Sequence, residues 1–155
     1  MTPLRDRTTW LRGDLFSCLQ PAPGGLRQWR LILLGPPGVG KGTQARLLAD
    51  ALGACPLSTS DIFRSQLERS QNLSLARIRD RMDRGMLLAD DYVLGLIRDR
   101  RRCLRCRGGF LLEGFPRTLI QAASLDALLS AEHVQLDAVI HYDLPFTELI
   151  VRMSG

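Results

Sequence analysis

A glycine-rich stretch that follows a short apolar run constrains the fold of this chain more than any other feature. Residues 31–34 (Leu-Ile-Leu-Leu) lead into Gly35-Pro-Pro-Gly-Val-Gly-Lys-Gly-Thr43, and a helical pattern with Ala45, Leu48 and Leu52 on one face follows. Strand, glycine loop and helix in this order are the context of a phosphate-binding loop. Glycines let successive backbone N–H groups turn inward, and the helix adds its positive N-terminal end. The stretch therefore predicts that this loop binds phosphate.

Lys41 strengthens this interpretation, because it is the only lysine in a chain with 21 basic residues. A compact ammonium suits phosphate oxygens. Gly35, Gly40 and Lys41 match the pattern G-x-x-x-x-G-K, but Gly42 stands where Ser or Thr is expected, and Thr43 comes one position later. A glycine-rich hairpin without a ligand is the alternative, and the flanking strand and helix disfavour it.

Size and charge restrict the function classes. A length of 155 residues predicts one domain, and the net charge of +5 suits a polyanionic partner such as a nucleotide. Nucleic acid is disfavoured, because aromatic residues make up 6% of the chain and none interleave with the arginines. No apolar run approaches the length of a membrane helix. We expect a monomer that binds neither nucleic acid nor a membrane.

The four cysteines indicate reduced thiols and a cytoplasmic protein. Cys103 and Cys106 have zinc-like spacing, but neither a second pair nor a histidine follows at a usual distance, so no zinc is expected. His133 and His141 lack partner spacing and are expected to be structural. Residues 98–107 carry six arginines and are interpreted as a solvated face.

The first 29 residues are interpreted as a flexible leader, because they carry prolines, a glycine pair and several arginines without an apolar core. An arginine-bearing transit peptide is the alternative, against which Asp6 and Asp14 count. The nucleotide-binding core is expected at residues 30–155.

Strand and helix patterns alternate along this core. Further strands are expected at 56–58, 109–113 and 137–143. Helices are expected to start at Ile62, to run up to Gly85, to start at Asp90, to follow the turn at 115–118 with Leu125 facing inward, and to start at Pro145. Such alternation predicts an α/β fold in three layers, with a parallel sheet flanked by helices and right-handed crossovers. The strand at 109–113 ends in Glu113, where ligands of such sheets bind.

Four segments together closely resemble adenylate kinase, of the nucleoside monophosphate kinase family. They are residues 35–44, residues 58–64, residues 85–91, and residues 109–118 with Gln121. The Gly-Lys-Gly-Thr-Gln spacing is that family's own variant of the loop, and Gly-Phe-Pro-Arg-Thr is the more specific signal. The similarity runs from about residue 30 to residue 155. It implies the P-loop NTPase fold with a small helical AMP-binding part at about residues 59–88.

The resemblance also implies a reaction, the reversible transfer of a phosphoryl group from MgATP to AMP that gives two ADP. It implies that Lys41, Arg64 and Arg117 are the catalytic cations, and that Glu113 helps to hold Mg²⁺, often through water. The ATP site implied is Gly38, Val39, Gly40, Lys41, Gly42, Thr43 and Arg152. The AMP site implied is Thr59, Arg64, Met86, Leu87, Leu88, Gly114, Phe115, Pro116, Arg117 and Gln121.

The sequence departs from the family pattern at three places. Glu113 stands where the family usually has Asp, and Ser60 replaces the usual Gly. The chain stops where the family's mobile lid would begin, so the lid and the last strand are expected to be absent. A nucleotide-binding fragment without full activity and a pyrimidine monophosphate kinase therefore stay as alternatives, although Thr59 and Gln121 favour adenine by resemblance. From the residues alone, the alternative for Thr59 is a helix cap, and the alternative for Gln121 is an exposed helical residue.

Overall fold

The computed structural model describes residues 10–11, 27–69, 73–84 and 86–155, so most of the predicted leader lies outside the described residues. The strands are β1 (Trp29–Leu34), β2 (Cys55–Ser58), β3 (Gly109–Glu113) and β4 (Ala138–His141). The helices are α2 (Lys41–Leu52), α3 (Thr59–Arg69), α4 (Leu73–Asp83), α5 (Asp90–Asp99), the 3₁₀ helix η2 (Arg101–Arg105), α6 (Leu119–Ala131) and α7 (Phe146–Ser154). The chain thus alternates strands with helices, as its pattern predicts.

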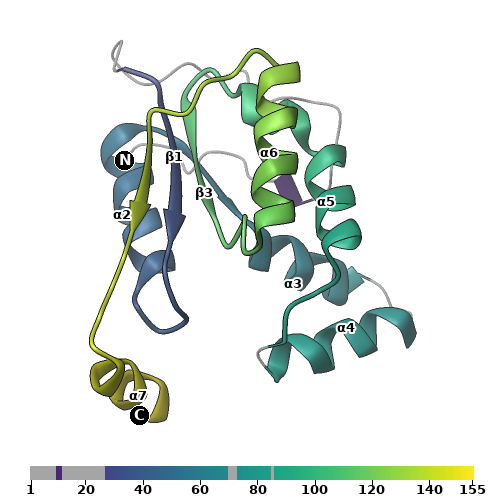
Figure 1. Ribbon diagram of the computed structural model, residues 1–155, viewed down its shortest axis with the longest axis vertical. Helices are drawn as coiled ribbons and strands as arrows, with labels where there is room; N and C mark the ends of the chain where they lie inside the picture. The colour runs from purple at the N-terminus through teal and green to yellow at the C-terminus, as the bar shows by residue number, and fades with distance from the viewer. Residues whose placement is uncertain (1–9, 12–26, 70–72, 85) are drawn as a thin grey trace.

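The four strands form one parallel sheet in the order β2-β3-β1-β4. All strands point toward the same end of the molecule, where the glycine loop leaves β1 and where α7 lies (Figure 1). Parallel strands need crossover connections, and the helices between them provide these. The predicted α/β fold with a parallel sheet flanked by helices is confirmed, and it brings the carboxyl ends of the strands together.

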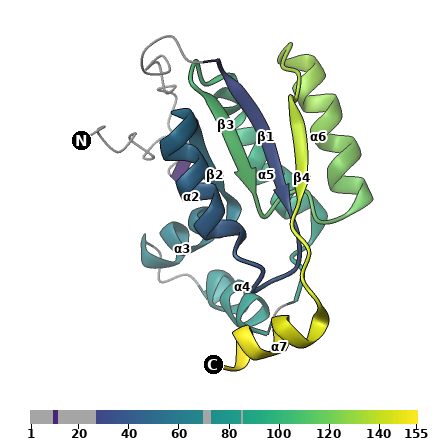
Figure 2. The same cartoon turned by 90° about the vertical axis from the view of Figure 1, so that its left-hand side faces the viewer.

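The sheet is covered on both faces, so neighbouring strand residues serve different cores. Phe110 and Leu112 of β3 pack with residues of α5 and α6, whereas Leu111 between them packs with Ala49 and Leu52 of α2. Successive side chains of a strand point to opposite faces, which is why an uninterrupted apolar run is required here. Figure 2 shows the result, with α2 on one face of the sheet and α6 on the other.

The helix boundaries differ from the expected ones mainly at α3. This helix follows β2 without a loop and begins at Thr59, not near Ile62, so Thr59 belongs to its first turn. Asp61 also lies in this turn, where a carboxylate interacts favourably with the positive end of the helix. The direct strand-to-helix junction fixes Thr59 at the carboxyl end of the sheet.

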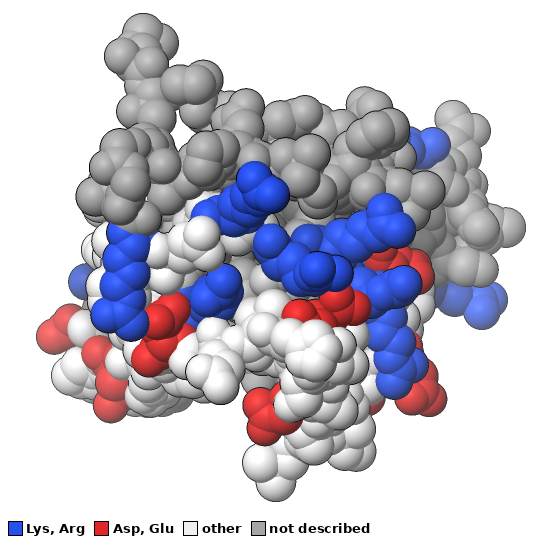
Figure 3. Space-filling model, turned by 90° about the horizontal axis from the view of Figure 1, so that it is seen from above, with Lys and Arg blue, Asp and Glu red and all other residues white. Residues whose placement is uncertain are grey.

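The arginine-rich stretch at residues 98–107 is exposed at five of its six arginines, in agreement with a solvated face. Arg101 and Arg105 lie 3.3 and 3.6 Å from the two carboxylate oxygens of Glu132. Figure 3, viewed from the end of the molecule at which the strands begin, shows basic side chains gathered among a few acidic ones. The exception is Arg100, which is buried.

None of the helices in the described part of the chain combines the length and the apolar character needed to cross a membrane.

The segment before β4 is connected to β1 by polar contacts. Asp137 accepts hydrogen bonds from the Arg27 guanidinium at 2.7 Å and from the Arg30 backbone N–H at 2.8 Å. These two bonds hold the pKa of the Asp137 carboxyl below its usual value. They also help to align the edge strand β4 with β1.

Candidate functional site

A cavity of about 1250 Å³ lies at the carboxyl ends of the strands. Its lining comes from the ends of β1, β2, β3 and β4 and from the segments that follow the first three. This is the position at which ligands bind in open α/β sheets. The predicted site residues that line it are Gly38, Gly40, Lys41, Gly42, Thr43, Arg64, Leu87, Glu113, Gly114, Phe115, Pro116 and Arg117.

The glycine loop forms one side of this cavity. Gly35 leaves β1 with φ 144°, and a Cβ there would lie 2.5 Å from the Tyr142 carbonyl oxygen, so this close approach requires glycine. At the other end of the loop, Gly40 adopts the left-handed conformation and directly precedes α2. No side chain caps α2, so its first N–H groups face the end of the sheet without an oxygen acceptor from a cap. The loop therefore has the form of an anion cradle.

Lys41 lies where the loop meets α2, and its ammonium donates a hydrogen bond to the Pro36 carbonyl at 2.8 Å. Burial lowers the pKa of Lys41 from its ordinary value, the nearby Glu113 carboxylate opposes this shift, and Arg117 adds to it. Lys41 therefore interacts electrostatically with both Glu113 and Arg117. A phosphate group between these three side chains would contact two cations and one carboxylate.

The opposite side of the cavity consists of the turn after β3 and the start of α3. Gly114 has φ 83°, and a Cβ at this position would lie 2.5 Å from the Thr59 hydroxyl oxygen. The Arg117 guanidinium donates to the Gly114 carbonyl at 2.8 Å, and the Thr59 hydroxyl donates to the Glu113 carbonyl at 3.4 Å. Arg64, whose guanidinium lies 3.4 Å from the Asp61 carboxylate, is exposed. Two arginines thus stand on the side facing the glycine loop.

Gln121 does not line the cavity and is almost completely buried, with 2% of its surface exposed. Its carbonyl oxygen accepts from the Arg117 backbone N–H at 2.8 Å, and its amide nitrogen donates to Asp90 at 2.8 Å. The Thr118 hydroxyl donates to the same Asp90 oxygen at 3.0 Å and accepts from the Gln121 backbone N–H. Gln121 therefore braces the turn that carries Arg117 against the start of α5, and it is not the exposed helical residue considered as an alternative above.

Gln121→Leu is expected to lower the free energy of unfolding by about 1–3 kcal/mol, because the change leaves the partly buried Arg117 N–H without its acceptor and removes the donor to Asp90 from a buried position. Chemical denaturation measures this loss. The control is Gln135→Leu, at an exposed glutamine, which should change stability by less than about 0.5 kcal/mol. Equal effects of the two changes would contradict the bracing role.

The other predicted site residues outside the lining differ in burial. Val39 and Thr59 are buried beside the cavity, Met86 and Arg152 are exposed, and Leu88 is half-buried. Arg152 belongs to α7, whose Met153 side chain would lie 2.8 Å from a Cβ placed on Gly38, so this helix lies next to the glycine loop. The roles implied for these residues stay predictions.

Among the lining residues to which the sequence assigned no ligand-binding role are His141 and Asp61. His141 ends β4, and Asp61 lies in the first turn of α3. The position of His141 could not be predicted from the sequence, because only the pairing of β4 with β1 brings His141 to the register position of Leu34. The signal available was positional, since His141 lies in the second half of the strand expected at 137–143.

The donor set at the cavity fits a magnesium ion that arrives with a nucleotide. No group of three or more His, Cys, Asp or Glu side chains among the described residues is arranged to hold a metal ion. Mg²⁺ commonly uses one or two carboxylates together with water and substrate phosphates, without a cage made entirely of protein ligands. Glu113 lies within electrostatic reach of Lys41 and offers such a carboxylate.

Comparisons with known proteins agree with this geometry. The sequence profile of the family described as adenylate kinase matches residues 33–155. Adenylate kinase of Desulforamulus reducens is 42% identical over 125 residues, and that of Methanocella arvoryzae is 44% identical over 126 residues; each match covers 81% of this chain and 58% of the relative. For adenylate kinase of Leptospira biflexa, the values are 41% identity, 81% of this chain and 67% of the relative. The chain thus spans 58% of the length of the first two relatives.

Proposed function

The chain belongs to the adenylate kinase family, and from this premise we propose that it catalyses reversible phosphoryl transfer from MgATP to AMP, giving two ADP. The observation that carries the proposal is the arrangement of the cavity. The glycine loop with Lys41 forms one side, and the Gly114–Arg117 turn with Arg64 forms the other. A donor nucleotide on the loop and an acceptor nucleotide at the turn would bring their phosphates together between them.

The reaction needs positioning and charge neutralisation more than covalent help from the protein. An oxygen of the AMP phosphate attacks the γ-phosphorus of ATP, the bond from that phosphorus to the bridging oxygen breaks, and the electron pair leaves on ADP. Lys41 binds phosphate oxygens of the donor. Arg64 and Arg117 are exposed to the cavity from the acceptor side and neutralise the charge that builds on the transferred group.

Magnesium, when bound with ATP, supplies further positive charge at the phosphates. Glu113 would hold it, directly or through water, together with the phosphate oxygens. The backbone of Glu113 is fixed by pairing with Leu33 on one side and Ser58 on the other. The position from which its side chain extends is therefore fixed as well.

A coupled assay for ADP formation, with AMP, CMP and UMP compared as acceptors, tests the proposal. We expect AMP to give the highest kcat/KM by at least about tenfold, because a site that hydrogen-bonds the edge of adenine would leave its polar groups unpaired with a pyrimidine. A preference for CMP or UMP would replace the proposal by a pyrimidine monophosphate kinase. Binding of ATP and AMP by calorimetry without any turnover would replace it by a nucleotide-binding module.

A further inference from the structure

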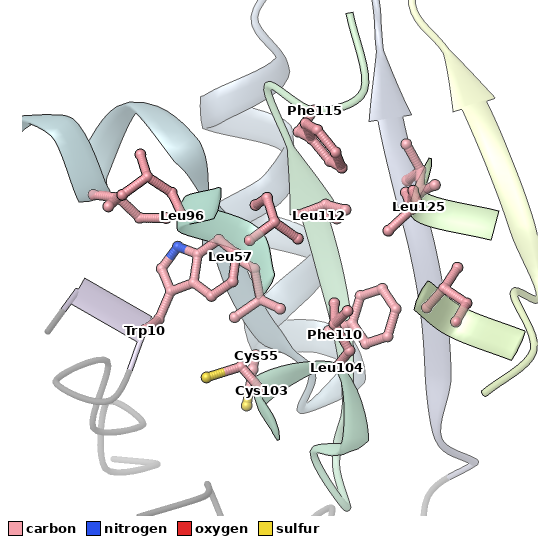
Figure 4. Close-up of a cluster of buried hydrophobic side chains, with 14 of the residues drawn as sticks. Trp10, Cys55, Leu57, Leu96, Cys103, Leu104, Phe110, Leu112, Phe115 and Leu125 are labelled. Carbon is pink, nitrogen blue, oxygen red and sulfur yellow. The ribbon is translucent and has the colours of Figure 1, made fainter. Parts of the chain in front are cut away.

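Trp10 precedes the glycine loop by some 25 residues in sequence, yet its side chain is part of the main core. It is 1% exposed, and it belongs to the cluster that contains Leu57, Leu96 and Leu104. Figure 4 shows the indole inserted beside Leu57 and Leu96, with its nitrogen directed toward the side of the cluster where these two leucines lie. A tryptophan buries a large apolar area and normally also needs a partner for its N–H.

The indole N–H has such a partner at a functionally placed atom. It donates to the Ser58 carbonyl oxygen at 2.8 Å. Ser58 is the last residue of β2, pairs with Glu113 of β3 and directly precedes Thr59. Ser58 lines the cavity, whereas Trp10 does not. The indole therefore supports this wall of the cavity from behind.

Arg100 holds Trp10 and Leu11, which we call the Trp10 segment, in this position. Its guanidinium is buried, and all three nitrogens donate to backbone carbonyls: Nε to Trp10, Nη2 to Leu11 at 3.2 Å, and Nη1 to Leu96 at 2.9 Å. Two of the three acceptors thus come from the Trp10 segment. Because a buried charged group without hydrogen-bond acceptors is strongly destabilising, undocking the segment would leave Arg100 poorly satisfied. The docked position is therefore stabilised both by the bond from the Trp10 indole to Ser58 and by the bonds from Arg100 to the Trp10 segment.

We propose that Trp10 is a positioning residue for the acceptor side of the cavity, acting through Ser58 on Thr59 and Glu113. The route is short, because each step joins residues that are adjacent in the chain, hydrogen-bonded or in direct contact. Trp10 fixes the Ser58 carbonyl, the Thr59 hydroxyl reaches the Glu113 carbonyl, and Gly114 lies directly against Thr59. The inference rests on the proposed function, because it takes the acceptor to be a nucleoside monophosphate.

Trp10→Phe tests the proposal, since it keeps an aromatic ring in the core and removes the N–H. We expect the dissociation constant for AMP to rise by about three- to tenfold, as the loss of one buried hydrogen bond implies, and that for MgATP to change by less than about twofold. Calorimetry of the full chain measures both. Hydrogen exchange of peptides covering residues 56–64, at a temperature well below unfolding, measures whether the β2–α3 junction loosens.

Trp29→Phe is the matched control. Trp29 is the other tryptophan of the chain, lies at the start of β1 and stacks with the Arg27 guanidinium, at the end of the sheet opposite to the cavity. The same chemical change there should leave AMP affinity and exchange at residues 56–64 unaltered. Arg100→Lys provides a second route, because lysine keeps the charge but cannot reach all three carbonyls, and it should weaken AMP binding in the same direction as Trp10→Phe.

The outcomes separate three cases. Faster exchange at residues 56–64 together with selectively weaker AMP binding supports the positioning role. Faster exchange with unchanged AMP affinity, or equal losses for AMP and MgATP, would show that Trp10 is merely structural and would overturn it. If the unaltered chain binds MgATP but no nucleoside monophosphate, the proposed function fails and the positioning role fails with it, and the exchange data still report whether Trp10 holds the junction.

Discussion

Lys41→Met is expected to weaken MgATP binding by about ten- to a hundredfold while the fold stays intact. The ammonium donates to the Pro36 carbonyl within the loop and is partly buried, so it already lies among the groups that would surround a phosphate. A hydrogen bond to a charged group contributes about 1.5–3 kcal/mol, and this corresponds to the affinity change expected. Methionine preserves the length of the side chain and removes the charge. Calorimetry measures the affinity, and circular dichroism measures the fold.

The control for Lys41→Met is Arg107→Met, which removes the same charge from an exposed residue next to β3 at the far end of the sheet. It should leave MgATP affinity within about twofold, because exposed charges more than about 10 Å apart are largely screened at physiological salt. Phosphoryl transfer should fall further than affinity in Lys41→Met, since the cation also stabilises the transition state. An unchanged MgATP affinity in Lys41→Met would mean that the loop is not the donor site.

Much of the site could be predicted because its parts are local in sequence. The loop from Gly35 to Lys41 is contiguous, and glycines with positive φ at Gly38 and Gly40 are required by the turn itself. Glu113 was recognisable as an acid at the end of an apolar run, and the parallel arrangement then places it near the loop. Periodicity and the rule that parallel strands need helical crossovers were sufficient for the fold.

What could not be predicted depends on contacts between distant residues. The hydrogen bond of Trp10 spans 48 residues, and those of Arg100 to the Trp10 segment span about 90. In the sequence, Arg100 is one of six arginines in a stretch whose other five arginines are exposed, and nothing local distinguishes it. The hydrogen bond of Gln121 to Asp90 could not be predicted either, because Asp90 lies 31 residues away in another helix. Side-chain roles that arise from packing are visible only after the elements are assembled.

Gly114 lies at the point where the turn after β3 meets α3, and it lacks room for any side chain. Its φ of 83° disfavours every residue with a Cβ, and such an atom would lie 2.5 Å from the Thr59 hydroxyl oxygen and 3.4 Å from an Arg117 guanidinium nitrogen. Thr59 has little freedom to move away, because it is 3% exposed and begins α3 directly after β2. Strain and overlap therefore act together at this position.

Gly114→Val is expected to lower the free energy of unfolding by about 3 kcal/mol or more, since left-handed strain and overpacking each cost about 1–3 kcal/mol. Adding Thr59→Ala should restore about 1–2 kcal/mol by removing the overlap but not the strain, and a double-mutant cycle from denaturation curves measures this coupling. Gly95→Val in α5 is the control, because no atom beyond its chain neighbours and the nearby backbone of its own helix lies within 4 Å of the added Cβ, and it should change stability by less than about 1 kcal/mol. If the two effects at Gly114 and Thr59 are additive, the contact between them does not hold the acceptor side of the cavity. If they are coupled, the narrow fit of Gly114 against Thr59 is what joins the turn carrying Arg117 to the β2–α3 junction.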